Sequence, residues 1–347
     1  MKLRLVSDLH IDVNDRYGVS LTENGDNDVF TLIAGDICGT VDDTISWINR
    51  NVRKGAFCAG NHIVYNPKAV GDWLASKVIV PIEDLKDSLH NAFPPESGIT
   101  FFDYDVGVMS KEIDDGVLLV SDVMYTDYRL KIPGINETGD YKFNMRMAEP
   151  RGMGGSYLND FVYGYTRKKM YAKEKWDDGE SRFGTPRGIW RLRAKYYRDH
   201  HLRAWKEVTR IVEENPDKDI VLMTHHCLSP KCISEDYVND RLNASYVSDK
   251  ERWIKKHPNI KLILSGHVHH RAHFKVGNTL YVLNPLGYCR DTMTQYNPET
   301  GKHEMWTPNC FVDTKTWNLT YEPYENGKWN EVRMGYISRY AAFDRFF

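Results

Sequence analysis

The chain has 347 residues, of which 41% are hydrophobic and 27% charged, and its formal net charge at pH 7 is −2. This composition is typical of a globular protein with a sizeable core, and it excludes disorder, collagen and coiled coil as descriptions of the whole chain. Apolar runs are too short to span a membrane, and six cysteines without a Cys-x-x-Cys pair do not form the pattern of a disulfide framework. The N-terminus turns polar by Ser7, so we expect no secretory signal and a cytoplasmic protein with reduced thiols.

Charge is unevenly distributed along the chain. Residues 141–206 contain 16 Lys and Arg against 7 Asp and Glu, together with 13 aromatic residues. Such a stretch is typical of a surface for a polyanionic partner, and equally of a solvated helical insert whose arginines pair locally. The sequence leaves both interpretations open.

Short apolar runs and intervening amphipathic segments predict an alternation of strands and helices. Strands are expected at 3–6, 30–33, 56–59, 99–102, 107–109, 117–120, 220–223 and 261–264. Helices are expected over 42–52, 191–214 and 248–256. Residues 124–159, with scattered Gly and Pro, predict a long irregular connection, and Asn326-Gly327 predicts a β-hairpin in the C-terminal tail.

The helix expected over 191–214 has an amphipathic pattern that ends before Pro216. Its apolar face is expected to contain Tyr197, Leu202, Trp205, Val208 and Val212. His200 and His201 lie at the border of this face, so we expect them to take part in helix packing rather than in a site.

Polar motifs directly follow five of the predicted strands. They are Asp8-Leu9-His10, Gly35-Asp36, Gly60-Asn61-His62, Thr224-His225-His226 and Gly266-His267-Val268-His269-His270. Seven of the 13 histidines lie in these motifs. Ligands of open α/β sheets bind at the carboxyl ends of the strands, and carboxylates with imidazoles suit divalent metals. The sequence therefore predicts a metal site at one edge of the sheet structure.

The order of these motifs resembles the calcineurin-like metallophosphoesterase superfamily, whose pattern is Asp-x-His, Gly-Asp, Gly-Asn-His with a following acid, a His after a strand, and Gly-His-x-His. Residues 61–65, 123–127, 242–249 and 284–288 further resemble a branch of small predicted phosphohydrolases. The resemblance implies a four-layer α/β/β/α sandwich of two mixed β-sheets. It runs over a domain of residues 1–290, interrupted by a mainly helical, basic and aromatic-rich insert over 126–206, and we expect a β-rich C-terminal extension over 291–347.

By the same resemblance, the protein is a binuclear metal-dependent phosphoesterase that hydrolyses a phosphomonoester or phosphodiester with a hydroxide that bridges two metal ions. One metal would be held by Asp8, His10 and His269. A second would be held by Asn61, His225 and His267, with Asp36 bridging the two. Manganese is the expected metal, with iron or zinc as alternatives, since this donor set suits all three and does not identify the ion.

His62 would stand beside the metals and protonate the leaving oxygen. The chain departs from the family pattern at the next position, where Ile63 replaces the acid that usually orients this histidine. Either another acid substitutes, or the substrate has a good leaving group, or the chain is a non-catalytic protein that binds a phosphate ligand. The segment after Asp36 also lacks the Asp-Arg-Gly sequel of Ser/Thr protein phosphatases, so that activity is not expected.

A small, nucleotide-type phosphorylated substrate is the favoured partner, and the alternative is a nuclease that binds DNA or RNA through the basic insert. Candidate substrate contacts are His226, Arg167, Lys168 and Lys169. We expect residues 141–206 to select the substrate and not to build the metal site, while residues 284–288 form a wall beside it. No membrane partner is expected, and the sequence does not define the oligomeric state.

Overall fold

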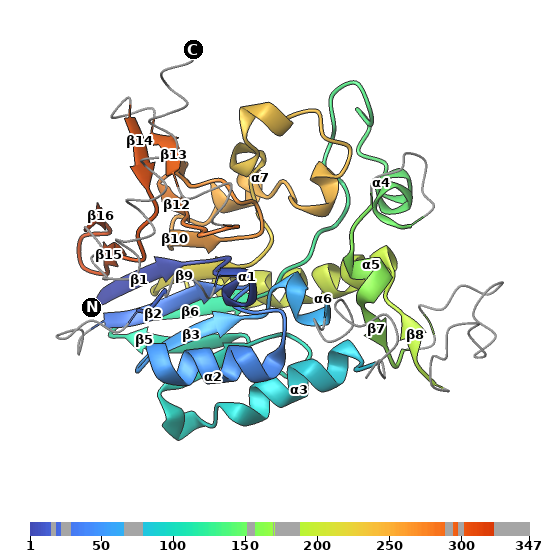
Figure 1. The fold of residues 1–347 in the computed structure, drawn as a ribbon. Helices are drawn as coiled ribbons and strands as arrows, with labels where there is room; N and C mark the ends of the chain where they lie inside the picture. The colour runs from blue at the N-terminus through green and yellow to red at the C-terminus, as the bar shows by residue number, and fades with distance from the viewer. Residues whose placement is uncertain are drawn as a thin grey trace, which may run out of the picture.

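The computed structural model describes residues 1–14, 19–21, 29–65, 79–150, 157–168, 170, 188–288, 294–297 and 302–322. Two six-stranded sheets form its centre (Figure 1). The first has the order β16-β15-β1-β2-β3-β4, built from β1 (Lys2–Val6), β2 (Val29–Ala34), β3 (Gly55–Cys58), β4 (Ile99–Phe102), β15 (Cys310–Asp313) and β16 (Leu319–Tyr321). Strands β1 to β4 are parallel, whereas β15 and β16 pair antiparallel at one side.

The second sheet has the order β11-β12-β10-β9-β6-β5. Its strands are β5 (Ser110–Asp114), β6 (Val117–Asp122), β9 (Asp219–Thr224), β10 (Ile260–Ser265), β11 (Ala272–Val276) and β12 (Thr279–Leu283). The four central strands are parallel, and β5 and β11 are antiparallel at the two edges. The expected pair of mixed sheets is therefore confirmed.

Alternation along the strands separates the buried side chains into layers, because successive residues of a strand point to opposite faces. Leu32 and Val221 belong to a cluster shared by the two sheets, whereas their neighbours Ile33 and Leu222 belong to the outer clusters. On the outer face of the first sheet pack α2 (Val41–Asn51) and α3 (Ile82–Ala92), which lie below the strands in Figure 1. On the outer face of the second pack α6 (Ala194–Glu214) and α7 (Glu251–Ile254). The result is an α/β/β/α sandwich.

The remaining elements surround this sandwich. They are α1 (Ile11–Asn14), α4 (Tyr141–Ala148), α5 (Asp160–Tyr163), β7 (Tyr165–Thr166), β8 (Trp190–Arg191), β13 (Thr294–Asn297) and β14 (Lys302–Met305). Elements α4, α5, β7 and β8 gather at one end of the sheets, on the right in Figure 1. No helix in the described ranges has the length and hydropathy needed to cross a bilayer.

Several expectations from the sequence are wrong. Residues 107–109 are not a strand: Val108 forms only a bridge with Asp103, and the strand begins at Ser110. The connection over 124–159 contains α4, which Asp140 caps by accepting a hydrogen bond from the Lys142 amide. Leu202 is 45% exposed, and the buried face of α6 instead includes His200 and His201.

Other differences concern elements without a strong sequence pattern. Helix α3 and strands β11 and β12 were not expected, and helix α7 covers only four residues of the expected 248–256. Cys38 and Cys58 are buried and have free thiols. The hairpin expected at Asn326-Gly327 lies outside the described residues.

Candidate metal centre

The seven predicted metal ligands lie on loops that follow β1, β2, β3, β9 and β10. These are parallel strands near the middle of the two sheets, so their carboxyl ends meet at one edge of the sandwich. Asp8, His10, Asp36, Asn61 and His225 are buried there, and His267 and His269 are half-buried. The structure therefore brings together side chains that are up to 261 residues apart, from Asp8 to His269.

The first group consists of Asp8, His10 and His269. The Nε2 atoms of His10 and His269 are 3.0 Å apart, and His269 Nε2 is 3.7 Å from Asp8 Oδ1. Asp8 Oδ1 accepts a hydrogen bond of 2.9 Å from the backbone amide of His267, whereas its Oδ2 is buried without a partner. A buried carboxylate oxygen without a hydrogen-bond donor is energetically unfavourable, and a cation bound beside it would offset this cost.

The second group is a triangle of donor atoms. Asn61 Oδ1 is 2.9 Å from both His225 Nε2 and His267 Nδ1, and these two nitrogens are 3.2 Å apart. His225 Nδ1 donates to the carbonyl of Ala34 at 2.9 Å, so its Nε2 is free to present a lone pair to the triangle. Asp36 Oδ2 lies 3.3 Å from His225 Nε2 and connects this group with the first.

Four of the predicted ligands share the same kind of backbone strain. Asp8, His10, Asp36 and His267 have positive φ angles of 49°, 42°, 49° and 69°. A non-glycine residue in this region costs about 1–3 kcal/mol, and such residues cluster at functional sites. The backbone also approaches two of the carboxylates closely at glycine residues. A Cβ atom on Gly60 would lie 1.7 Å from Asp36 Oδ1, and one on Gly266 would lie 2.6 Å from Asp8 Oδ2. Any side chain at Gly60 or Gly266 would therefore clash with these carboxylates, so both positions require glycine.

Electrostatics keeps most of the imidazoles neutral. Burial lowers the pKa of His10 and His267 well below the usual value, and that of His269 to about 4. Burial also raises the pKa of Asp8 to about 7. For His225, burial opposes the charge, but Asp36 and Asp8 outweigh it and raise the pKa to about 9. The imidazoles of His10, His267 and His269 are therefore neutral and can donate lone pairs, whereas His225 would release its proton when an ion binds. Imidazoles and carboxylates that converge in this way suit divalent transition metals, so the residues present fit two such ions.

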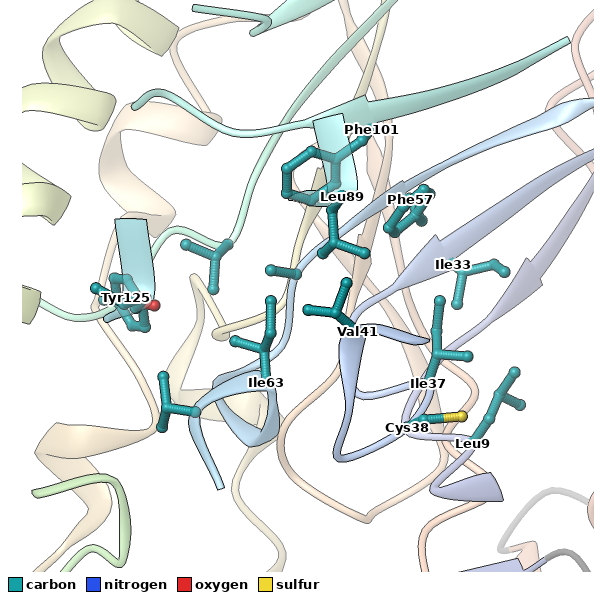
Figure 2. Packing of buried hydrophobic residues seen from close by; sticks show 14 of the residues in the cluster. Leu9, Ile33, Ile37, Cys38, Val41, Phe57, Ile63, Leu89, Phe101 and Tyr125 are labelled. Carbon is teal, nitrogen blue, oxygen red and sulfur yellow. The ribbon is translucent and has the colours of Figure 1, made fainter. Parts of the chain in front are cut away.

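His62 lies at the margin of these groups on a short 3₁₀ turn, η2 (Asn61–Val64). Its amide donates to Asp36 Oδ1 at 3.0 Å, and its Nε2 is 3.3 Å from the hydroxyl of Tyr288 and 3.8 Å from Asp36 Oδ2. The tight turn directs Asn61 and His62 toward the centre and turns the next side chain away. Ile63 accordingly joins the buried cluster with Val41 (Figure 2), where an acid would be desolvated.

A residue that the sequence did not indicate reaches the centre from the insert. Asp160, on α5, is fully buried and accepts a hydrogen bond of 2.8 Å from Asn61 Nδ2. Burial raises its pKa to about 6. Asp160 thus gives a predicted ligand a buried partner from residues 141–206, and the expectation that these residues do not build the metal site stays a prediction. The sequence could not indicate Asp160, because it is a single acid that lies 99 residues from its partner and belongs to no repeating pattern or motif.

The predicted substrate contacts are dispersed. His226 is buried and its ring stacks on His267 with centroids 4.2 Å apart, and neither of its ring nitrogens has a hydrogen-bond partner. Arg167 is exposed and forms an ion pair with Asp84, and Lys168 Nζ is 3.6 Å from Asp105. Lys169 lies outside the described residues. The role of these four residues stays a prediction.

Tyr288 occupies the wall expected at residues 284–288. Its ring is 4.7 Å from those of both His10 and His269, centroid to centroid. The amide of Gly287 donates to the carbonyl of Asp8 at 2.9 Å, which ties this wall to the first ligand loop.

Among solved structures, the chain is similar to phosphopantetheinyl hydrolase from Mycobacterium tuberculosis, with 14% identity and a TM-score of 0.56 over 83% of this chain and 90% of that one. It is also similar to a Staphylococcus aureus protein assigned as a 5′-nucleotidase, with 10% identity and a TM-score of 0.39 over 96% of this chain and 57% of that one. No family model and no curated protein sequence matches the chain. The first similarity spans most of both chains and shows that they share a fold, in agreement with the resemblance seen in the sequence.

Proposed function

We propose that this protein is a metal-dependent phosphoesterase that hydrolyses a small phosphorylated compound. The observation that carries the proposal is the convergence of seven Asp, Asn and His side chains into two groups of donor atoms that share Asp36. The shared fold with a phosphopantetheinyl hydrolase supports it. Manganese is the proposed metal, with iron or zinc as alternatives, because the mixed oxygen and nitrogen donors suit all three.

In the proposed mechanism, Asp8, His10 and His269 would hold one ion, and Asn61, His225 and His267 would hold the other, with Asp36 available to both groups. Two bound divalent ions would polarise the phosphate and provide a hydroxide nucleophile at neutral pH. His62 keeps 17% of its side chain exposed at the margin of the centre and donates a proton to the leaving oxygen. The Tyr288 hydroxyl lies 3.3 Å from His62 Nε2, on the side of the ring that faces the centre, and contributes to positioning this imidazole.

The favoured substrate is a nucleotide-type phosphomonoester or phosphodiester. The ring of Tyr65 packs on His62 with centroids 4.2 Å apart, and the ring of Tyr163 meets Tyr65 edge-on at 5.9 Å. Tyr163 is 36% exposed, so it offers an aromatic surface next to Tyr65 and near His62, which would protonate the leaving group. Aromatic faces of this kind bind planar bases by stacking.

The nuclease alternative depends on free basic side chains in the insert. Several of those described are already paired: Arg167 with Asp84, Arg193 with Glu149, and Lys195 with Asp199. Paired cations attract a polyanion less strongly than free ones. This pairing favours the small substrate over a nucleic acid.

The test is a hydrolysis panel with p-nitrophenyl phosphate, bis-p-nitrophenyl phosphate, nucleotides and single-stranded DNA, each with and without Mn²⁺. The proposal expects Mn²⁺-dependent turnover of one or more small substrates and little or none of DNA. Preferential turnover of DNA would favour the nuclease. Metal binding without any turnover would favour a protein that only binds a phosphate ligand.

The role of His62 is tested on pairs of esters that differ in leaving group. The variant His62→Ala should lose about 10²- to 10⁴-fold in turnover of alkyl esters and far less for p-nitrophenyl esters, whose leaving group needs no proton. Equal losses on both would mean that His62 binds phosphate instead.

A further inference from the structure

We propose that Asp160 is a positioning residue that fixes the orientation of the Asn61 amide, so that the insert completes one of the two metal positions. The inference rests on the proposed function, because it assigns a task to Asn61 as a ligand. It concerns a side chain outside the five motifs that identify the centre in the sequence. Its starting observation is the hydrogen bond of 2.8 Å from Asn61 Nδ2 to Asp160 Oδ1, between two buried side chains.

Both hydrogens of the Asn61 amide point away from the donor triangle. One is directed to Asp160, and the other reaches the hydroxyl of Tyr65 at a distance of 3.3 Å. Asp160 Oδ1 and the Tyr65 hydroxyl therefore both lie on the nitrogen side of the amide, and only Oδ1 of Asn61 faces His225 and His267.

The hydrogen bonds from the Asn61 amide select one of its two possible orientations, which have almost the same shape. If the amide were rotated by half a turn, Nδ2 would face the two imidazole nitrogens, and an amide nitrogen has no lone pair to offer a cation. A carboxylate only accepts hydrogen bonds, so Asp160 binds the nitrogen side of Asn61 and rejects the oxygen side. A bond to an ionised acceptor is also stronger than one between neutral groups. Asp160 therefore holds the oxygen toward the metal position.

The insert holds Asp160 firmly in place. The amide of Gly164 donates to the carbonyl of Asp160 at 2.8 Å, and the amide of Leu192 donates to the carbonyl of Gly164 at 2.9 Å, which ties α5 to β8. A Cβ atom on Gly164 would lie only 2.5 Å from the Leu192 side chain, so the two segments are in close contact. Phe161 packs on Tyr197 of α6 with ring centroids 5.1 Å apart. The carboxylate is presented by a packed element and not by a loose loop.

The experiment measures metal affinity in the full-length chain, independently of any substrate. The protein is stripped with a chelator and titrated with Mn²⁺ by calorimetry and with Co²⁺ by visible absorption. The variants are Asp160→Ala, Asp160→Asn, which keeps an acceptor oxygen, and Tyr65→Phe, which removes only the hydroxyl. Val162→Ala is the matched control, because Val162 lies on the same helix and carries no polar group. Circular dichroism verifies that each variant is folded.

In wild-type protein we expect two ions. Asp160→Ala should weaken one of them by about 10- to 100-fold, the usual effect of losing a partner of a metal ligand, and should change the Co²⁺ spectrum of that site. Asp160→Asn should recover most of the affinity, Tyr65→Phe should have a smaller effect than Asp160→Ala, and Val162→Ala should leave both ions unchanged.

Two results separate the failure of this inference from the failure of the proposed function. If wild-type protein binds two ions and folded Asp160→Ala binds both with unchanged affinity, the positioning role is wrong although the metal centre stands. The same conclusion follows if Asp160→Asn is as weak as Asp160→Ala, since an acceptor oxygen would then not be enough. If wild-type protein binds no metal, the proposed function itself is wrong.

Discussion

Two clusters of Asp and His side chains lie in the sandwich, and they differ in where their positive charge comes from. The first is the candidate metal centre after β1, β2, β3, β9 and β10. The second, which we call the charge cluster, joins α3, β6, α6 and the segment after β4. It consists of Lys86, Asp103, Asp105, Asp122 and His200.

In the charge cluster, the protein supplies its own cations. Lys86 Nζ is 2.9 Å from both Asp103 Oδ2 and Asp105 Oδ2. His200 uses both ring nitrogens on carboxylates, with Nε2 at 2.9 Å from Asp122 Oδ1 and Nδ1 at 3.2 Å from Asp105 Oδ2. Burial opposes the charge on His200, but the carboxylates outweigh it and raise the pKa to about 9. Lys86 and His200 thus place positive charge beside all three carboxylates.

In the candidate centre, the imidazole nitrogens face one another, and among the described residues Oδ2 of Asp8 has no hydrogen-bond donor and no ammonium group beside it. Asp103, Asp105 and His200 have atoms as close together as those of a metal site, yet the ammonium of Lys86 already lies between the carboxylates. The comparison shows that the composition of a cluster does not define a metal site. The direction of its hydrogen bonds does.

The largest effect is expected from Asp36→Ala, which removes the carboxylate shared by both donor groups. Metal ions contribute several kcal/mol to transition-state stabilisation, so phosphoesterase activity should fall by about 10³-fold or more. Elemental analysis should find that both ions are lost or strongly depleted. A variant that retains two ions and full activity would refute the assignment of Asp36.

The next effect concerns the stability of the charge cluster. Lys86→Met removes the buried ammonium and leaves Asp103 and Asp105 without it, which should cost about 3–5 kcal/mol of unfolding free energy. Urea unfolding measures this loss, and elemental analysis of the folded fraction should find an unchanged metal content. Loss of metal in folded protein would mean that the two clusters are coupled.

The charge on His200 predicts a dependence of stability on pH. The pKa of His200 is about 9 in the folded chain and lies above the ordinary value of 6.5. The contribution of its charge to the unfolding free energy is therefore fully present below pH 6.5 and is lost as the pH rises through 9. The shift corresponds to about 3 kcal/mol. The difference in unfolding free energy between wild-type protein and His200→Gln should shrink by up to this amount between pH 6 and pH 9.5. A constant difference would mean that His200 is neutral in the folded state.

The smallest effect is expected at the basic insert. Neutralising Arg167, Lys168 and Lys169 together should raise KM for a polyanionic substrate by roughly tenfold, because exposed charge pairs contribute about 0.2–1 kcal/mol each. The effect should weaken at high salt, and hydrolysis of p-nitrophenyl phosphate and metal content should barely change. If the triple variant loses metal, or loses both activities in parallel, these residues support the fold.

Much of the fold could be predicted, because each strand is marked by the apolar pattern of its own few residues. The apolar runs near residues 3–6, 30–33, 99–102 and 220–223 all form strands, since buried parallel strands need short continuous apolar segments. The helix α6 was expected from its 3.6-residue period, but Leu202 was assigned to the wrong face. Tertiary contacts decided that face, because Asp105 and Asp122 bind His200 strongly enough to bury a polar side chain.

The sequence by itself indicated that the five polar motifs meet at one edge, because each motif directly follows a strand and the carboxyl ends of parallel strands lie together. The assignment of individual ligands follows from the resemblance and stays a prediction. The sequence could not determine how those ligands are held. The hydrogen bond from Asn61 to Asp160 joins residues 99 positions apart, and that from His62 to Tyr288 joins residues 226 apart. Only the packing of the insert and of the loop after β12 against the same edge brings these partners together, since no local pattern records a contact between distant segments.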